Sequence, residues 1–302
     1  MHIRYRTLFT SKSGLEYLSL NSDGIDFLSV QGSASSSDRM RRIYASGQRL
    51  FNADPDYALK PVSCVCNEHS TNAVFQGELG GALREFLTHA PSVLQYAEGK
   101  RIGRILKAYH DQPISDKQKT RAKERQEHFL ERLAQYIGEL PHFAGDSKAI
   151  EAISKRFGSY DCYRACMRYG QLRHDRIYVR SDLTPVLLPS STCAPGDICE
   201  DFALMECHSA GVYPLYCAGV IDGYFQGEVS PEFFVSFALQ CALYSLWHCG
   251  KEAKLSDESF GRMQKTYAQI LMDFDNFNDC VPRWYQTREL QAVREQARKQ
   301  GM

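Results

Sequence analysis

The sequence has no surplus of charge of either sign, no long apolar run and no paired cysteine motif. Its 302 residues contain 36 Lys and Arg against 36 Asp and Glu. This balance argues against a general nucleic-acid-binding protein, because such proteins need a surplus of basic residues opposite phosphates. No stretch approaches the roughly 18 consecutive apolar residues of a membrane-spanning helix, and the first residues do not resemble a signal peptide. We therefore predict a cytoplasmic protein with no nucleic-acid partner and no membrane partner.

The eleven cysteines form none of the C-x-x-C pairs that are typical of structural zinc sites. Their number is odd, and they lie in segments that otherwise look like core helices and strands. We therefore expect buried free thiols rather than disulfides. A metal or redox role is the alternative, and the closest groupings are Cys64 and Cys66 near His69, Cys162 with Cys166 at helical spacing, and His248 with Cys249.

What is present is an apolar fraction of 43%, which is enough for a packed core and one large or two modest domains. Alternating patterns predict one β-hairpin over residues 17–30, turning at 21–24, and a second over 57–76, turning near 67–69. A helix is expected to begin at Asp38, between the two hairpins.

The pattern becomes helical after the glycine-rich segment 77–81. We expect an amphipathic helix over 115–136, with Phe129, Leu130 and Leu133 on its apolar side, and a central core helix over 233–248 that follows a Ser-Pro-Glu start. The fold class predicted is α+β, a two-lobed protein-kinase-like fold. Its β-rich N-terminal lobe would span 1–79 and its mainly helical C-terminal lobe 80–302, with the hinge near 76–81.

Several short motifs occur in an ordered series along the chain. They are a Gln-Tyr helix with two glycines over 95–110, GDICEDF over 196–202, YPLY over 213–216, IDGYFQGE over 221–228, PEFF over 231–234 and VPRWY over 281–285. In order and spacing, these motifs resemble the aminoglycoside phosphotransferase family of small-molecule kinases. The resemblance covers roughly residues 10–285 and implies the kinase-like fold.

Active members of that family need a catalytic aspartate, an asparagine and a second aspartate for Mg²⁺, and a Lys or Arg that pairs with the triphosphate. Counting from the matching motifs, the resemblance places the H-G-D-x-H-x-G-N run on residues 169–176, the second aspartate at 189 and the cation at 29. This sequence has Tyr169 for the histidine, Gln171 for the catalytic aspartate, Arg176 for the asparagine, Pro189 for the metal aspartate and Ser29 for the cation.

Each replacement removes a chemical capacity. Gln171 cannot accept a proton, and general-base help is typically worth about 10²–10⁴-fold. Arg176 would place a fixed positive charge where Mg²⁺ should bind, and the Pro189 side chain supplies no ligand. A shifted register that uses His174 and Asp175 as a relocated catalytic pair is the alternative. We also predict that Arg176 meets a carboxylate, with Asp175 and Asp182 the nearest in sequence.

The sequence thus predicts a pseudokinase, which keeps the fold, has lost phosphoryl transfer and serves a binding or regulatory role. Its partner would be an unknown protein or small molecule in the interlobe cleft, and no metal or other cofactor is expected. The alternative is an active ATP-dependent phosphotransferase that uses ATP and Mg²⁺ on an aminoglycoside or another hydroxyl-bearing metabolite, through the relocated groups.

Three further features have structural interpretations. We expect Asp197, Glu200 and Asp201 to organise the C-terminal lobe, and the segment 273–275 to be structural rather than a kinase metal motif. Between residues 100 and 125 there are nine Lys and Arg against three Asp and Glu. They are interpreted as solvated helix faces, with a basic surface for an anionic partner as the alternative.

Overall fold

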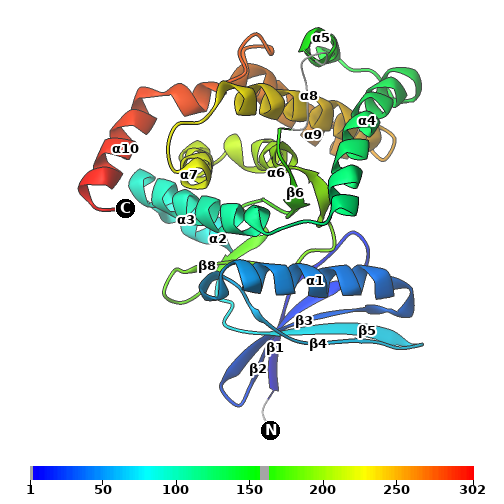
Figure 1. Ribbon diagram of the computed structural model, residues 1–302, viewed down its shortest axis with the longest axis vertical. Helices are drawn as coiled ribbons and strands as arrows, with labels where there is room; N and C mark the ends of the chain where they lie inside the picture. Colours follow the sequence, from blue (N-terminus) through cyan, green and yellow to red (C-terminus); the bar gives the residue numbers. More distant parts are fainter. Residues whose placement is uncertain (1–2, 157–162) are drawn as a thin grey trace. The chain divides into compact units, whose positions relative to one another are not determined.

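The computed structural model describes residues 3–156 and 163–302 (Figure 1). The chain forms two compact units, each made of two segments. The first unit combines residues 1–89 with 169–193, and the second combines 90–168 with 194–302. The predicted domains, 1–79 and 80–302, follow the order of the chain, whereas the segment 169–193 packs with the N-terminal sheet.

The first unit is built on a five-stranded antiparallel sheet with the order β1-β2-β3-β5-β4. Its strands are β1 (Ile3–Thr10), β2 (Glu16–Ser22), β3 (Ile25–Ser33), β4 (Lys60–Cys66) and β5 (Ser70–Gln76). Both predicted hairpins are confirmed, and the first turns at Asp23 and Gly24, which have positive φ angles. Strand β1 was not predicted from the sequence.

One helix, α1 (Ser37–Ala53), packs against this sheet (Figure 1). Met40 and Ile43 of α1 are fully buried with Leu28 and Val30 of β3 and Phe75 of β5. Short 3₁₀ helices, Ala34–Ser36 and Pro55–Tyr57, flank α1, and α2 (Leu83–His89) follows the sheet. This core confirms the predicted helix between the hairpins.

The segment 169–193 joins the first unit through a small second sheet. Strand β7 (Ile177–Val179) pairs with β8 (Pro185–Leu187) in antiparallel fashion. Val179 also exchanges main-chain hydrogen bonds with the glycine segment, accepting from Gly80 and donating to the carbonyl of Gly81, both at 2.9 Å. These bonds anchor the strand that follows the loop 169–176.

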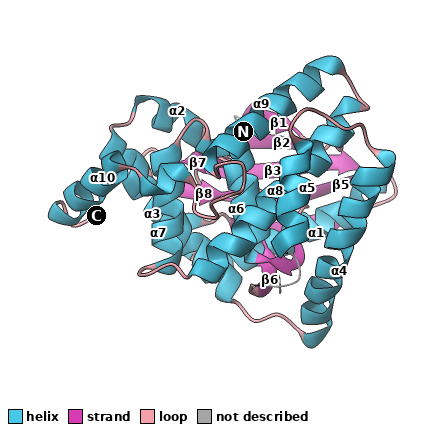
Figure 2. Cartoon of the chain, turned by 90° about the horizontal axis from the view of Figure 1, so that it is seen from above, coloured by secondary structure: helices cyan, strands magenta, loops and turns pink. Residues whose placement is uncertain are grey.

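The second unit is mainly helical (Figure 2). Its helices are α3 (Ser92–Asp111), α4 (Asp116–Glu139), α5 (Asp146–Arg156), α6 (Ile198–Met205), α7 (Pro214–Phe225), α8 (Pro231–Ala253), α9 (Asp257–Asp273) and α10 (Arg288–Lys299), with a π-helical turn at Glu206–Ala210 and a 3₁₀ turn at Arg283–Gln286. A short sheet pairs β6 (Ala165–Arg168) with β9 (Ala194–Asp197). The described segments thus confirm the predicted α+β class.

Helix α8 is the predicted core helix. Ser230 caps its first turn and Pro231 occupies the first position, as the sequence indicates. The helix is long and apolar enough to cross a membrane by composition, but 72% of its most apolar window is buried inside the protein. Helix α4 begins with a capping box at Ser115, and Phe129 and Leu133 face inward, whereas Leu130 is 44% exposed. The prediction for Leu130 was therefore wrong.

Helices α3 and α7 cross in direct main-chain contact through two pairs of glycines. A Cβ atom at Gly99 or Gly103 would lie about 2.1–2.2 Å from the carbonyl oxygens of Tyr216 or Val220. A Cβ atom at Gly219 or Gly223 would be equally close to main-chain oxygens of α3. No side chain fits there, so these motif glycines are required for packing.

The ten cysteines of the described residues are free, which confirms the expectation for that part of the chain. Cys162 lies outside the described residues, and Cys166 is in strand β6. Within residues 3–156 and 163–302, no group of three or more His, Cys, Asp or Glu is arranged to hold a metal ion. Asp273 is buried at the end of α9 beside Glu206, as the structural interpretation predicted.

Candidate functional site

The loop between β6 and β7 contains residues 169–176, to which the sequence resemblance assigns the family's catalytic run. Gly170 has a φ of +73° and lies against Thr192, whose carbonyl oxygen would be 2.7 Å from an added Cβ. Its own carbonyl accepts a hydrogen bond from the Thr192 hydroxyl at 2.8 Å. The glycine shared with the family pattern is thus needed for the local main-chain conformation.

Of the replaced residues, Tyr169 lies in the interior of the first unit and Gln171 is half-buried. Tyr169 is fully buried, and its hydroxyl donates to the carbonyl oxygen of Leu188 at 2.9 Å. Gln171 has a buried Oε1 atom that makes no hydrogen bond among the described residues. An amide in this position cannot take up the proton of an acceptor hydroxyl.

Asp175 is enclosed by positive charge. Arg173 forms a fork onto it, with Nε to Oδ1 and Nη2 to Oδ2 both at 2.9 Å, and Arg176 Nε lies 3.8 Å from Oδ2. Burial tends to raise the pKa of Asp175, but the hydrogen bonds and charge of Arg173, with Arg176 and His174, lower it overall. The carboxylate is therefore stabilised in its ionised form and is a weaker base.

Arg176 also stacks on an aromatic pair in the first unit. Its guanidinium carbon lies 4.1 Å from the centre of the Phe9 ring, which stacks on Tyr17 at 4.3 Å. Asp175, rather than Asp182, is the carboxylate it meets; the Asp182 carboxylate accepts from the main-chain nitrogen of Thr184. The predicted carboxylate partner of Arg176 is thus Asp175, which it shares with Arg173.

Pro189 and Ser29, the remaining two replacements, also make contacts within the first unit. Pro189 is buried, and its carbonyl oxygen accepts a long hydrogen bond from the Tyr17 hydroxyl at 3.5 Å. Ser29 is 1% exposed on β3, donates to Asn72 Oδ1 at 2.9 Å and accepts from Gln31 at 3.2 Å. The triphosphate-pairing position is therefore part of a neutral polar cluster.

These residues do not fit Mg²⁺. The ion prefers several oxygen ligands in octahedral geometry, usually including carboxylates. Here Gln171 offers one neutral oxygen, Pro189 only its main-chain oxygen, and Arg176 a fixed positive charge. The one nearby carboxylate, Asp175, is already paired with Arg173 and Arg176.

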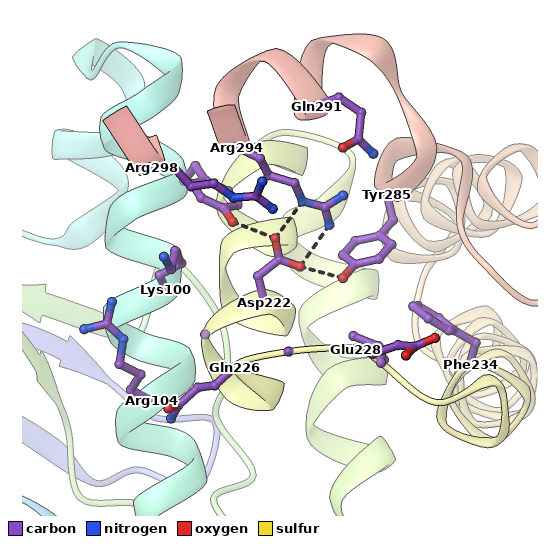
Figure 3. Close-up of a pocket in the computed structure, with 14 residues that line it drawn as sticks. Lys100, Arg104, Asp222, Gln226, Glu228, Phe234, Tyr285, Gln291, Arg294 and Arg298 are labelled. Carbon is purple, nitrogen blue, oxygen red and sulfur yellow. Dashed lines mark hydrogen bonds and ion pairs between the residues drawn. The ribbon is translucent and has the colours of Figure 1, made fainter. Parts of the chain in front are cut away.

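The matching motifs of the second unit form a different kind of cluster, centred on Asp222 of α7 (Figure 3). Asp222 accepts hydrogen bonds from the hydroxyls of Tyr96 at 2.6 Å and Tyr285 at 2.5 Å. Arg294 of α10 adds a fork at 2.7 and 2.9 Å. The Gln-Tyr, IDGYFQGE and VPRWY motifs are thus joined at one carboxylate, together with α10.

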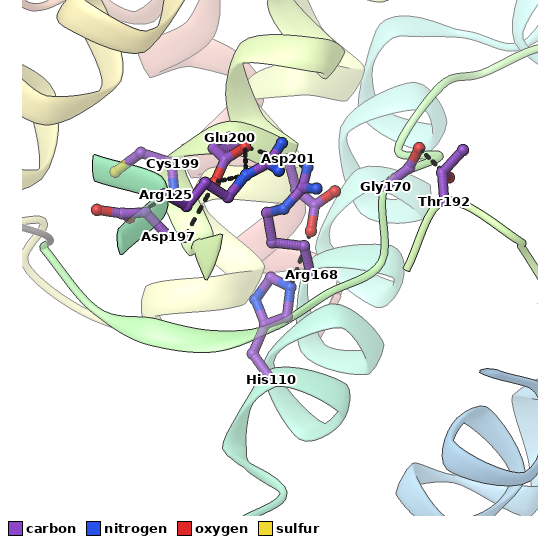
Figure 4. A network of polar contacts seen from close by, with 9 residues as sticks. All are labelled: His110, Arg125, Arg168, Gly170, Thr192, Asp197, Cys199, Glu200 and Asp201. Atoms are coloured by element: carbon purple, nitrogen blue, oxygen red, sulfur yellow. Dashed lines mark hydrogen bonds and ion pairs between the residues drawn. The ribbon is translucent and has the colours of Figure 1, made fainter. Parts of the chain in front are cut away.

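A second network joins α3 to α6 (Figure 4). Both nitrogens of the buried His110 ring are engaged, one 3.1 Å from Asp201 Oδ2 and the other 3.1 Å from the Tyr224 hydroxyl. Glu200 accepts from Arg125 and pairs with Arg168 at 3.3 Å. These contacts agree with the interpretation of these acids as organising residues.

Asp197 begins α6 as its N-terminal cap. It accepts from the main-chain nitrogens of Cys199 at 2.9 Å and Tyr163 at 2.6 Å. Burial raises its pKa to about 6, although these hydrogen bonds act in the opposite direction. The first residues of the GDICEDF motif therefore serve to start a helix and to hold β6 against it.

Comparison with known proteins was made at the levels of sequence and structure. No family model and no curated sequence matches the chain. Solved structures do match: spectinomycin phosphotransferase with ADP and spectinomycin has a TM-score of 0.61 at 8% identity, covering 98% of this chain and 93% of that one. The fold is that of the aminoglycoside phosphotransferases and the choline/ethanolamine kinase-like proteins.

Two further neighbours extend this result. A choline/ethanolamine kinase family protein from Mesorhizobium loti has a TM-score of 0.60 at 11% identity, covering 97% of this chain and 92% of that one. Macrolide 2'-phosphotransferase type I has a TM-score of 0.57 at 14% identity, with 85% and 89% covered. The predicted kinase-like fold is confirmed, and at these identities the likeness concerns the fold alone.

The structure brings Tyr169, Gln171, Arg176, Pro189, Ser29, His174 and Asp175 into one unit, the first. Sequence reasoning missed the cluster around Asp222, and with it the role of Arg294. The signal was an aspartate inside an apolar helix, because a buried carboxylate needs several donors around it.

Proposed function

We propose that this chain is a phosphotransferase-like pseudokinase, a cytoplasmic protein that has a binding or regulatory role and does not transfer phosphate. The kinase-like fold supports the general class. The nature of the partner, a protein or a small molecule, stays a prediction, as does the expectation that no cofactor is needed.

The proposal rests mainly on the ion cluster of the loop 169–176. Phosphoryl transfer is catalysed largely by positioning and by charges directed at the phosphates and their metal ions. In this loop the Asp175 carboxylate and the Arg173 and Arg176 guanidinium groups are directed at one another. The one carboxylate of this loop is thereby engaged by two guanidinium groups, so it is not available to hold a metal or to activate a hydroxyl.

Thermal unfolding with ATP, in the presence and absence of Mg²⁺, tests this proposal. A specific site filled at a hundred times its Kd would add about 2.7 kcal/mol, or about 5 °C in Tm for a chain of this size. We expect no Mg²⁺-dependent rise of that order and no transfer of phosphate from ATP. Spectinomycin phosphotransferase, which was solved with ADP, serves as the positive control.

An Mg²⁺-dependent rise of about 5 °C, with turnover of ATP, would contradict the proposal. If the Asp175→Asn variant then lost that turnover, the alternative of an active phosphotransferase with relocated groups would replace it. Loss of turnover in Asp175→Asn can be interpreted only if the variant is folded. Its unfolding curve without nucleotide is therefore recorded first.

A further inference from the structure

A pocket of about 770 Å³ lies in the second unit, between α3, α7 and α10 (Figure 3). It shares no residue with the family's catalytic positions, which all lie in the first unit. Its volume falls within the range of roughly 300–1,000 Å³ that is usual for small-molecule sites. The pocket is therefore large enough for a small organic ligand.

One wall of the pocket is preorganised. Asp222 holds Tyr96, Tyr285 and Arg294 in place through four hydrogen bonds. The Arg294 guanidinium lies 4.7 Å from the centre of the Tyr285 ring, and Phe234 lies 5.4 Å from the same ring. This wall combines a neutralised ion pair with aromatic surface, so it offers contact area without excess charge.

The rim of the pocket carries an excess of positive charge. Lys100 and Arg104 project from α3, one turn apart, and Arg298 from α10 (Figure 3). Among the described residues, Arg104 and Arg298 make no ion pair and no side-chain hydrogen bond. Lys100 donates to the main-chain oxygen of Met302 at 2.9 Å, so an oxygen acceptor already lies on this rim.

The charges around Lys100 act on it in both directions. Burial and then the charge of Arg104 lower the pKa of Lys100, Asp222 raises it, and Arg298 lowers it by a smaller amount. The other acid that lines the pocket, Glu228, lies on the far side from these cations (Figure 3). Repulsion of this kind is relieved when an anion binds between the cations.

We propose that the pocket between α3, α7 and α10 binds a small phosphate-bearing molecule. Its phosphate would lie among Lys100, Arg104 and Arg298, and its organic part against Tyr285 and Phe234. Two guanidinium groups and an ammonium group match the charge and oxygen geometry of a phosphate dianion better than those of a single carboxylate. Two members of the basic segment 100–125, Lys100 and Arg104, thus belong to a binding site rather than to a solvated helix face.

Titration calorimetry with phenyl phosphate, in the absence of Mg²⁺ and nucleotide, tests this site. The Arg104→Ala/Arg298→Ala variant should bind at least about tenfold more weakly, because it loses the charge-assisted hydrogen bonds of two guanidinium groups to the phosphate. The matched control, Arg288→Ala/Lys299→Ala, removes the same charge from exposed positions of α10 that do not line the pocket. It should bind within about twofold of the original chain.

A conservative variant, a salt series and a second ligand are the further measurements that test this proposal. The Arg104→Lys/Arg298→Lys variant keeps the charge and should retain most of the affinity, which separates loss of binding from loss of folding. Higher salt should weaken binding, because the cations are partly exposed. No binding of phenyl phosphate, equal binding by all variants, or equally tight binding of benzoate would overturn the proposal. None of these outcomes depends on whether the protein transfers phosphate.

Discussion

One carboxylate of the first unit and two of the second are held in opposite ways. In the first unit Asp175 lies between two guanidinium groups, and its pKa is lowered. In the second unit burial raises the pKa of Asp197 to about 6 and that of Glu98 to about 7. The first unit thus keeps this carboxylate ionised between guanidinium groups, whereas the second holds these two acids inside a helical core.

This difference explains why the family resemblance is uneven along the chain. The motifs that match are in the second unit, and they are packing groups: glycines at a helix crossing, a helix cap and the Asp222 cluster. The positions that do not match are those to which the sequence resemblance assigns the family's chemistry. The fold requires the packing residues but not the residues assigned to the chemistry. The two groups can therefore change independently.

The largest effect is expected at the crossing of α3 and α7. Gly103→Ala or Gly219→Ala would place a Cβ about 2.1–2.2 Å from a carbonyl oxygen of the facing helix, so the helices must separate. We expect a loss of at least about 3 kcal/mol in the free energy of unfolding, measured by denaturant titration.

Gly261 of α9 is the matched control for this comparison. It lies within a helix and has no atom within 4 Å of an added Cβ. Gly261→Ala should therefore stabilise the protein by about 0.5–1 kcal/mol, through helix propensity alone. Equal effects at the crossing and at Gly261 would show that the glycine motifs are not packing elements.

A smaller, pH-dependent effect is expected at Glu98 of α3. Its Oε1 is buried without a hydrogen bond among the described residues, and Arg101 approaches only its other oxygen, at 3.3 Å. Burial raises its pKa from 4.5 to about 7, although Arg101 opposes this. Between these values the folded chain binds more protons than the unfolded chain, so stability falls as the pH rises and is constant above about 7.

Glu98→Gln removes this titration. The variant should be more stable than the original chain by about 1–3 kcal/mol at pH 8, with the difference vanishing near pH 4.5. Glu127→Gln, at an exposed position of α4, makes the same change of charge and should leave the pH profile unaltered. A stability curve for Glu98→Gln that runs parallel to the original between pH 4.5 and 8 would contradict the assignment.

The sequence predicted those parts of the fold that depend on residues close together in the chain. The hairpins, the helix starts and the core helix α8 depend on local patterns, and they were predicted. Strand β1 carries an alternation too weak to stand out, because most of its described residues are exposed at a sheet edge. The Asp222 cluster joins residues 72 and 126 positions apart, and no local pattern shows such a pairing.

The candidate site was predictable only by counting from matched motifs. That count identified Gln171, Arg176 and Pro189 as replacements, but not what would surround them. The neutralisation of Arg176 by Asp175 was expected from proximity alone, since buried charges need partners. The fork of Arg173 onto Asp175 and the stacking of Arg176 on Phe9 needed the three-dimensional structure.

The smallest effect, and the sharpest test of the first unit, is that of restoring one catalytic group. Gln171→Asp returns a carboxylate to the family's base position, where the Gln171 amide oxygen is buried. We expect no phosphoryl transfer from ATP and no Mg²⁺-dependent change in Tm, because Arg176 and Pro189 still provide no metal ligand. General-base help alone, about 10²–10⁴-fold, cannot act on a phosphate that is not held.

The double variant Gln171→Asp/Asp175→Asn is the control, since it keeps the new carboxylate and removes the relocated one. Turnover in Gln171→Asp that persists in this control would show that position 171 still faces a functional phosphate site, and that the other losses do not prevent catalysis.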